Sequence, residues 1–172
     1  MIASQAKGHR RYQDYSMSYQ IQPQNILVVD DEPMIQEALK MILIPQGHTI
    51  VLASDGPEAL ERFARQKFDV VFTDLNMPEM RGDELARRIR RENPYQVIVM
   101  ISAYANLLTP RQRKETPVDL YINKPFQLQT IFDALQSAHE INKARRKDAE
   151  QIDQASQLVA AVAAGPARAA CT

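Results

Sequence analysis

Short apolar runs alternate with amphipathic segments through most of the chain. Runs typical of buried strands lie at residues 26–30, 49–53, 69–74, 96–102 and 118–122. Between them we expect helices over 33–44, 57–66, 82–92 and 110–115, and a last one from about residue 127, where apolar residues recur at helical spacing. Pro33, Pro57 and Pro110 each stand where the first residue of a helix belongs. Because strands and helices alternate, the pattern predicts an α/β fold, with a doubly wound five-stranded parallel sheet and helices on both faces.

The same pattern divides the chain into three parts. Residues 1–24 are polar and lack a period, which predicts a flexible N-terminal arm. Residues 25–143 carry the alternating pattern and predict one domain. Residues 144–172 predict a C-terminal helical extension and tail, because helix-forming residues continue until Gly165-Pro166 stops them. The extension has only a narrow apolar stripe, so a helix held by a partner or a second copy and a frayed, solvated tail both remain open.

Charge and composition narrow the class of protein. Lysines and arginines number 21, as do aspartates and glutamates, which argues against direct nucleic-acid binding and against a polybasic membrane anchor. No apolar run approaches the roughly 18 residues of a membrane span, and the N-terminus lacks the apolar stretch of a signal peptide. The single cysteine, Cys171, excludes a disulfide framework. We therefore expect a soluble cytoplasmic protein.

Polar residues stand where four of the predicted strands end. Asp30-Asp31 closes the first strand, Asp74 the third and Ser102 the fourth, and Lys124 follows the fifth. Each has an ordinary explanation when taken alone: a helix cap, a turn residue or a solvated lysine. The carboxyl ends of strands in an open parallel sheet line the ligand crevice, so these residues are expected to meet. Three carboxylates, a hydroxyl and an ammonium together suit a divalent cation and a phosphoryl group.

In this order and context, the residues resemble the receiver domain of bacterial response regulators. Asp30-Asp31 resembles the acidic pair after the first strand of that family, and Asp74, which stands three residues before Met77-Pro78, resembles its phosphoacceptor. Ser102 resembles the hydroxyl residue after the fourth strand, and Lys124 the lysine of the Lys-Pro-Phe motif after the fifth.

The resemblance covers residues 25–143 and carries several implications. It implies a flavodoxin-like strand order 2-1-3-4-5, phosphorylation of Asp74 by a histidine kinase or a phosphotransfer protein, and dependence on Mg²⁺. It also implies that the Lys124-Pro125 peptide bond is cis. The protein would then be no enzyme in the ordinary sense, since it would catalyse only its own phosphorylation and dephosphorylation.

The expected metal site uses oxygen ligands, as Mg²⁺ prefers. Asp31 and Asp74 are expected to bind the ion directly, the backbone carbonyl of Asn76 to supply a third ligand, and Asp30 to act through water. Lys124 is expected to pair with a phosphoryl oxygen as a compact point charge.

Ser102 and Tyr121 are the expected switch residues. Ser102 would donate a hydrogen bond to a phosphoryl oxygen and draw the following loop inward, and Tyr121 would turn into the space left behind. Tyr121 precedes the lysine of the motif by three residues, which is the position of the family's aromatic switch residue.

Two further expectations concern the helices. Thr109-Pro110 predicts that the helix after the fourth strand starts late and is short, because proline inside a helix is costly. The arginines of the preceding helix are expected to form a solvated face, with a docking patch as the alternative: Arg87, Arg88, Arg90 and Arg91.

Other functions fit these residues less well. A phosphatase of the haloacid-dehalogenase type would need a general acid two residues after Asp74, where Asn76 stands. A nucleotide or flavin site would need glycines after the first strand, and none is there. The complete set of site residues argues against an inactive docking domain. The output stays open between a stand-alone regulator, a phosphorelay intermediate and a fragment of a longer regulator, as do the downstream target and a homodimer.

Overall fold

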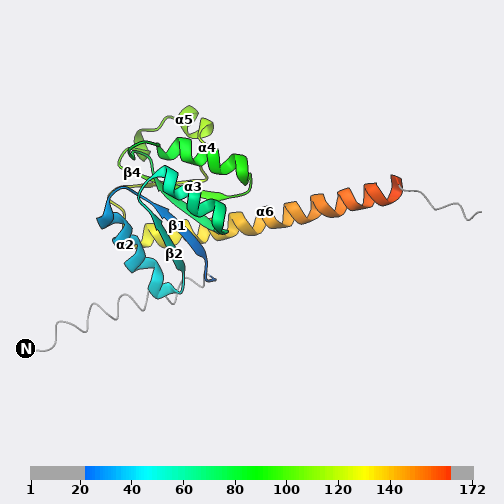
Figure 1. Cartoon of the computed structure of the whole chain (residues 1–172), viewed down its shortest axis with the longest axis horizontal. Helices are drawn as coiled ribbons and strands as arrows, with labels where there is room; N and C mark the ends of the chain where they lie inside the picture. Colours follow the sequence, from blue (N-terminus) through cyan, green and yellow to red (C-terminus); the bar gives the residue numbers. More distant parts are fainter. Residues whose placement is uncertain (1–21, 164–172) are drawn as a thin grey trace, which may run out of the picture.

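The computed structural model describes residues 22–163 of the chain (Figure 1). Most of the predicted N-terminal arm, the predicted helix stop at Gly165-Pro166 and Cys171 lie outside the described residues. Within the described part, no helix is both long and apolar enough to cross a membrane.

A five-stranded parallel sheet forms the centre of the molecule. Its strands are β1 (Asn25–Val29), β2 (Thr49–Ala53), β3 (Val70–Asp74), β4 (Val97–Ser102) and β5 (Leu120–Asn123). They pair in the order β2-β1-β3-β4-β5, all in parallel. The predicted fold class and strand order are therefore confirmed, and the strand ends differ from the predicted ones by at most two residues.

The central strands are mostly apolar, as expected where helices cover both faces of the sheet. Side chains alternate between the faces of a strand. Accordingly, Ile26 and Val28 of β1 pack in one core cluster, whereas Leu27 and Val29 pack in a second cluster across the sheet. This is the burial expected of a parallel sheet between helical layers.

The helices are α2 (Pro33–Leu43), α3 (Gly56–Arg65), α4 (Gly82–Glu92), α5 (Pro110–Glu115) and α6 (Leu128–Ala163), with 3-10 turns at η1 (Ile44–Gln46) and η2 (Ala105–Leu107). Helices α2 and α6 cover one face of the sheet, and α3 and α4 cover the other. Helix α5 is short and starts at Pro110, as predicted, and the Thr109 hydroxyl caps it by accepting from the Gln112 N–H.

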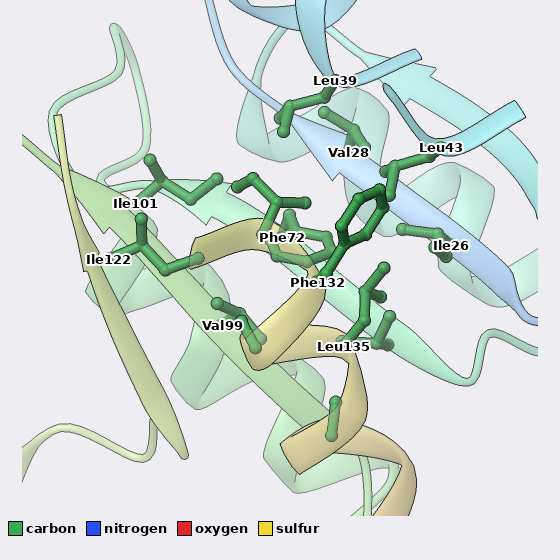
Figure 2. Packing of buried hydrophobic residues seen from close by; sticks show 14 of the residues in the cluster. Ile26, Val28, Leu39, Leu43, Phe72, Val99, Ile101, Ile122, Phe132 and Leu135 are labelled. Carbon is green, nitrogen blue, oxygen red and sulfur yellow. The ribbon is translucent and has the colours of Figure 1, made fainter. Parts of the chain in front are cut away.

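The core on the α2 and α6 side is centred on aromatic and aliphatic side chains that interdigitate (Figure 2). Phe132 and Leu135 of α6 point toward Phe72 of β3, and Leu39 and Leu43 approach from α2. These contacts fix the first turns of α6 on the sheet.

Helix α6 continues as one helix beyond the sheet, and its distal part projects from the globular body (Figure 1). Where it leaves the sheet, Asn142 donates to the Asp69 carbonyl at 2.7 Å, and Arg146 pairs with the Asp69 carboxylate at 3.0 Å. Ion pairs with the sheet therefore extend past residue 143. The predicted boundary at that residue and the partner role of the extension stay predictions.

A carboxylate at the start of β5 joins α4 to α6. The Asp119 carboxylate, 10% exposed, accepts hydrogen bonds from Arg90 at 2.7 Å, from Arg145 at 2.5 Å and from the Ile98 N–H at 2.8 Å. The expectation that the α4 arginines form a solvated face is therefore wrong for Arg90, whose side chain is only 16% exposed. Its partner lies 29 residues away in the sequence, beyond the reach of helical periodicity.

We predict that Asp119→Ala lowers the free energy of unfolding by about 3 kcal/mol, because it leaves two partly buried arginines without their counter-ion. Urea denaturation followed by circular dichroism measures this change. Glu61→Ala is the matched control: it breaks an exposed pair with Arg65 and should cost at most about 0.5 kcal/mol. Equal, small losses for both variants would show that the Asp119 cluster does not stabilise the fold.

Candidate functional site

Parallel pairing brings the predicted polar residues to one edge of the sheet. Asp30 directly follows β1, Asp74 and Ser102 are the last residues of β3 and β4, and Lys124 directly follows β5. Strand β1 pairs with β3, β3 with β4 and β4 with β5, so these strand ends lie side by side. Ser102 pairs with Asn123, the residue before Lys124.

The Lys124 ammonium is the centre of this edge. Its Nζ lies 2.8 Å from Asp74 Oδ1, 2.9 Å from Asp30 Oδ2 and 3.0 Å from Glu32 Oε1. The lysine side chain is 14% exposed, and those of Asp30 and Asp74 are 2% and 8% exposed. The ammonium therefore neutralises two carboxylates that are largely shielded from water. The peptide bond between Lys124 and Pro125 is cis, as the resemblance implied.

The electrostatics of the cluster follow from burial and pairing. Burial raises the pKa of Asp30 above its ordinary value, against the hydrogen bond from Lys124 that acts to lower it. Burial also acts to lower the pKa of Lys124, but hydrogen bonds to Asp74, Asp30 and Glu32 outweigh it and hold that pKa above its ordinary value. The lysine is thus kept charged.

Asp74 is held by backbone on its other side. Its Oδ2 accepts a hydrogen bond from the Asn76 N–H, while Oδ1 faces Lys124. Helix α4 begins close behind the strand end, where the Gly82 N–H donates to the Leu75 carbonyl at 3.0 Å. A Cβ on Gly82 would come within 2.0 Å of the Asp74 carbonyl oxygen, so only glycine fits there.

The predicted switch residues are close to this cluster, on β4 and β5. Ser102 is fully buried, and its Oγ accepts from the Tyr104 N–H at 3.1 Å. The Tyr121 ring lies beneath the guanidinium of Arg113, 5.0 Å from Cζ to the ring centroid. Its hydroxyl is buried, and no hydrogen bond of normal geometry from the described residues holds it.

The predicted metal ligands are only partly gathered. Asp30 and Asp74 share Lys124, but Asp31 is exposed and makes no ion pair or hydrogen bond with the described residues. Asn76 is also exposed. Across residues 22–163, no three His, Cys, Asp or Glu side chains are grouped as a ready metal site. The oxygen donors nevertheless suit Mg²⁺, which needs only one or two carboxylates and keeps several waters.

Glu32, Asn106 and Asn123 join the edge without having been predicted. Glu32 directly follows the acidic pair and reaches Lys124, and its place in a run of three acids was the available signal. The Asn123 side chain accepts from the Asn106 N–H at 2.9 Å and donates to the Asn106 side chain at 2.5 Å, which ties η2 to β5. Nothing in the sequence marks those two asparagines as partners.

Comparison with known proteins assigns this arrangement to a family. The family model of the response regulator receiver domain matches residues 26–136. The chain belongs to the response regulator receiver family. Receivers are generally signalling modules of two-component systems and not enzymes that act on a separate substrate.

Individual relatives agree with the family. The probable transcriptional regulatory protein TcrX of Mycobacterium tuberculosis is 32% identical over 138 residues, which are 80% of this chain and 57% of TcrX. Response regulator RR06 of Streptococcus pneumoniae serotype 2 is 36% identical over 104 residues, which are 60% of this chain and 48% of RR06. This receiver chain thus spans about half the length of these two curated relatives.

A solved receiver structure also matches. The response regulator protein TrrA from Thermotoga maritima, in complex with Mg²⁺ and BeF, is 33% identical with a TM-score of 0.61. The match covers 66% of this chain and 97% of TrrA. The alignment thus extends over nearly the whole of TrrA.

We predict that Gly82→Ala destabilises the receiver by about 2 kcal/mol, because the added methyl group meets backbone that must shift. It should also slow phosphorylation by acetyl phosphate, since the shift falls on Asp74. Gly47→Ala is the control: Gly47 has a φ of 86°, but a Cβ there would meet Pro23 Cγ only at 3.9 Å, an ordinary contact. The cost should therefore be about 1 kcal/mol without loss of phosphorylation. Chemical denaturation and phosphorylation rates measure both, and a Gly82→Ala variant with wild-type values would contradict the close contact.

Proposed function

We propose that this receiver accepts a phosphoryl group on Asp74 from the phosphohistidine of a histidine kinase or a phosphotransfer protein, and then changes conformation to control a partner. The observation that carries the proposal is the position of the Lys124 ammonium, 2.8 Å from Asp74 and 2.9 Å from Asp30 at the carboxyl edge of the sheet. A buried cation beside a carboxylate suits the transfer of a doubly charged phosphoryl group.

In the proposed transfer, an oxygen of the Asp74 carboxylate attacks phosphorus. A P–O bond forms as the P–N bond of the donor phosphohistidine breaks, and the bonding electron pair returns to the imidazole nitrogen. The product is an acyl phosphate on Asp74. Lys124 keeps its charge throughout and pairs with a phosphoryl oxygen, while the Asn76 N–H is placed to donate to the same group.

The proposal includes Mg²⁺, with Asp31, Asp74 and the Asn76 carbonyl as ligands and Asp30 acting through water. When bound, the ion neutralises charge on the phosphoryl group. Support comes from the oxygen donors at the edge and from TrrA, a receiver solved in complex with Mg²⁺ and BeF. Binding requires the exposed Asp31 side chain to turn toward Asp74, which its lack of partners among the described residues leaves it free to do.

The proposed response to phosphate involves Ser102 and Tyr121. The Ser102 hydroxyl oxygen accepts a hydrogen bond from the Tyr104 N–H, and its own proton remains available to donate to a phosphoryl oxygen. Moving Ser102 toward Asp74 would carry Tyr104 with it, and the Tyr121 ring could then turn into the vacated space. This is a population shift driven by contacts made only to phosphate.

The output is proposed from the relatives. TcrX is named a probable transcriptional regulatory protein, and the chain spans 57% of it. We therefore keep two arrangements for the output. The receiver acts alone or in a phosphorelay, or it is part of a longer regulator that controls a downstream partner. A cytoplasmic location and the absence of direct nucleic-acid contact by the receiver itself belong to the same proposal, as does self-association through α6.

We predict that the wild-type protein, incubated with acetyl phosphate and Mg²⁺, gains the mass of one phosphoryl group, which hydroxylamine removes. Asp74→Asn should take up none while keeping its fold, because an amide of nearly the same shape is not a nucleophile. Asp69→Asn is the control for loss of a carboxylate elsewhere on the sheet and should be phosphorylated normally. Intact-mass spectrometry gives the result, and normal phosphorylation of Asp74→Asn would remove Asp74 as the acceptor.

We predict that Mg²⁺ raises the thermal stability of the unphosphorylated protein, by about 1.4 kcal/mol at ten times its Kd, since a ligand bound only by the native state stabilises it. Asp31→Ala should abolish most of this gain, whereas Asp148→Ala, which removes an exposed carboxylate on the distal part of α6, should not. Differential scanning calorimetry with and without millimolar Mg²⁺ measures the effect. A melting temperature that does not change when Mg²⁺ is added would contradict the proposed metal site.

A further inference from the structure

One side chain of α5 contacts both elements of the proposed switch. Arg113 Nη2 donates to the Ala105 carbonyl at 2.7 Å, and Ala105 is a fully buried residue of η2. The same guanidinium covers the Tyr121 ring at 5.0 Å. Arg113 therefore connects the loop after β4 with the aromatic side chain of β5.

This pair of contacts sets Arg113 apart from the other arginine on α5. Arg111 pairs along the helix with Glu115 at 2.8 Å, and both side chains are largely exposed. Helix α5 has no buried residue of its own. Its attachment to the rest of the domain therefore depends on contacts such as those of Arg113.

Arg113 contacts the same segment to which Ser102 is bonded. Ser102 is bound to the loop through its Oγ and the Tyr104 N–H, and Ala105 follows Tyr104. In the proposed switch, a shift of Ser102 toward a phosphoryl group on Asp74 would move this segment relative to Arg113. The hydrogen bond from Arg113 to Ala105 and the cover of the Tyr121 ring would then have to change with it.

We propose that Arg113 is a positioning residue that holds Tyr121 and the loop after β4 (residues 103–109) in the unphosphorylated conformation. It thereby sets how readily phosphorylation changes the conformation of this loop. The proposal rests on the proposed function of Asp74 and Ser102. The hydrogen bond and the cation–π contact stabilise only the resting conformation. Because ligand binding and conformation are linked reciprocally, a residue that favours the resting state slows formation of the phosphorylated one.

The loop keeps a second attachment when Arg113 is removed. Asn123 holds Asn106 through two hydrogen bonds, at 2.9 Å and 2.5 Å. Arg113→Ala should therefore leave the domain folded and change the balance between two conformations, without unfolding the loop. Circular dichroism and the urea midpoint would verify this before any rate is compared.

The test uses the full chain in four forms: wild type, Arg113→Ala, Arg113→Lys and the control Arg111→Ala. We expect Arg113→Ala to raise the rate of phosphorylation by acetyl phosphate with Mg²⁺ about fivefold, which matches the loss of one exposed cation–π contact and one hydrogen bond. Arg113→Lys should give an intermediate rate, since it keeps the charge but loses the planar fork. Arg111→Ala should match wild type.

Hydrogen exchange without any phosphodonor supplies the second measurement. Amides of residues 103–109 should exchange faster in Arg113→Ala than in wild type or Arg111→Ala. Unchanged exchange in Arg113→Ala would overturn the proposal, whatever the wild type does with acetyl phosphate. A slower phosphorylation rate in Arg113→Ala would overturn it too, because Arg113 would then assist the reaction and not restrain it.

Failure of the receiver function gives a different pattern. If the wild type takes up no phosphoryl group on Asp74, the proposed function fails, and with it the effect of Arg113 on phosphorylation. Faster exchange in Arg113→Ala would in that case still show that Arg113 restrains the loop. The two measurements therefore separate the restraint from the reaction that it is proposed to regulate.

Discussion

Two carboxylates buried together at one sheet edge require a cation, and Lys124 supplies it. Like charges repel strongly where water is excluded, so the carboxylates of Asp30 and Asp74 would destabilise each other there without a nearby cation. The lysine that joins them is 94 residues from Asp30 in the sequence, and only the order of the parallel strands brings the two together. This pairing of charges depends on the packing of the sheet, on the absence of a side chain at Gly82 and on the position of β5.

The two ends of the sheet use charge in different ways. At the amino end, the Asp119 carboxylate lies between Arg90 and Arg145, and the Ile98 N–H donates a further hydrogen bond to it. Guanidinium groups present several donors in a fixed fork, which suits a stable structural ion pair. At the carboxyl end, the single ammonium of Lys124 is shared among its acidic partners. A point charge on a flexible stem can follow a new anion, which suits an edge where a group arrives and leaves.

Local patterns in the sequence were enough to locate the strands and most helices, because these depend on periodic burial along short segments. Helix α5 buries no residue and was located by its start signal, Thr109-Pro110. The meeting of Asp74 and Lys124 also followed, since the carboxyl ends of parallel strands share one edge. The strand order was available only through the resemblance to receivers. The Arg90–Asp119 contact, 29 residues apart, could not be predicted because helical spacing identifies a face and not its partner. The same limit hid the contact of Arg113 with Tyr121.

The α6 helix continues without a break beyond the sheet as an arm, and the direction of this arm is set where it leaves the sheet. The arm is anchored by Arg145 and Arg146, and it runs on to Ala163, roughly 25 Å further along the axis. A small tilt at the anchor becomes a larger displacement at the tip, as with any lever. Each residue inserted into the arm would also turn a group at the tip by about 100° around the axis, so the length of this helix encodes an angle as well as a distance.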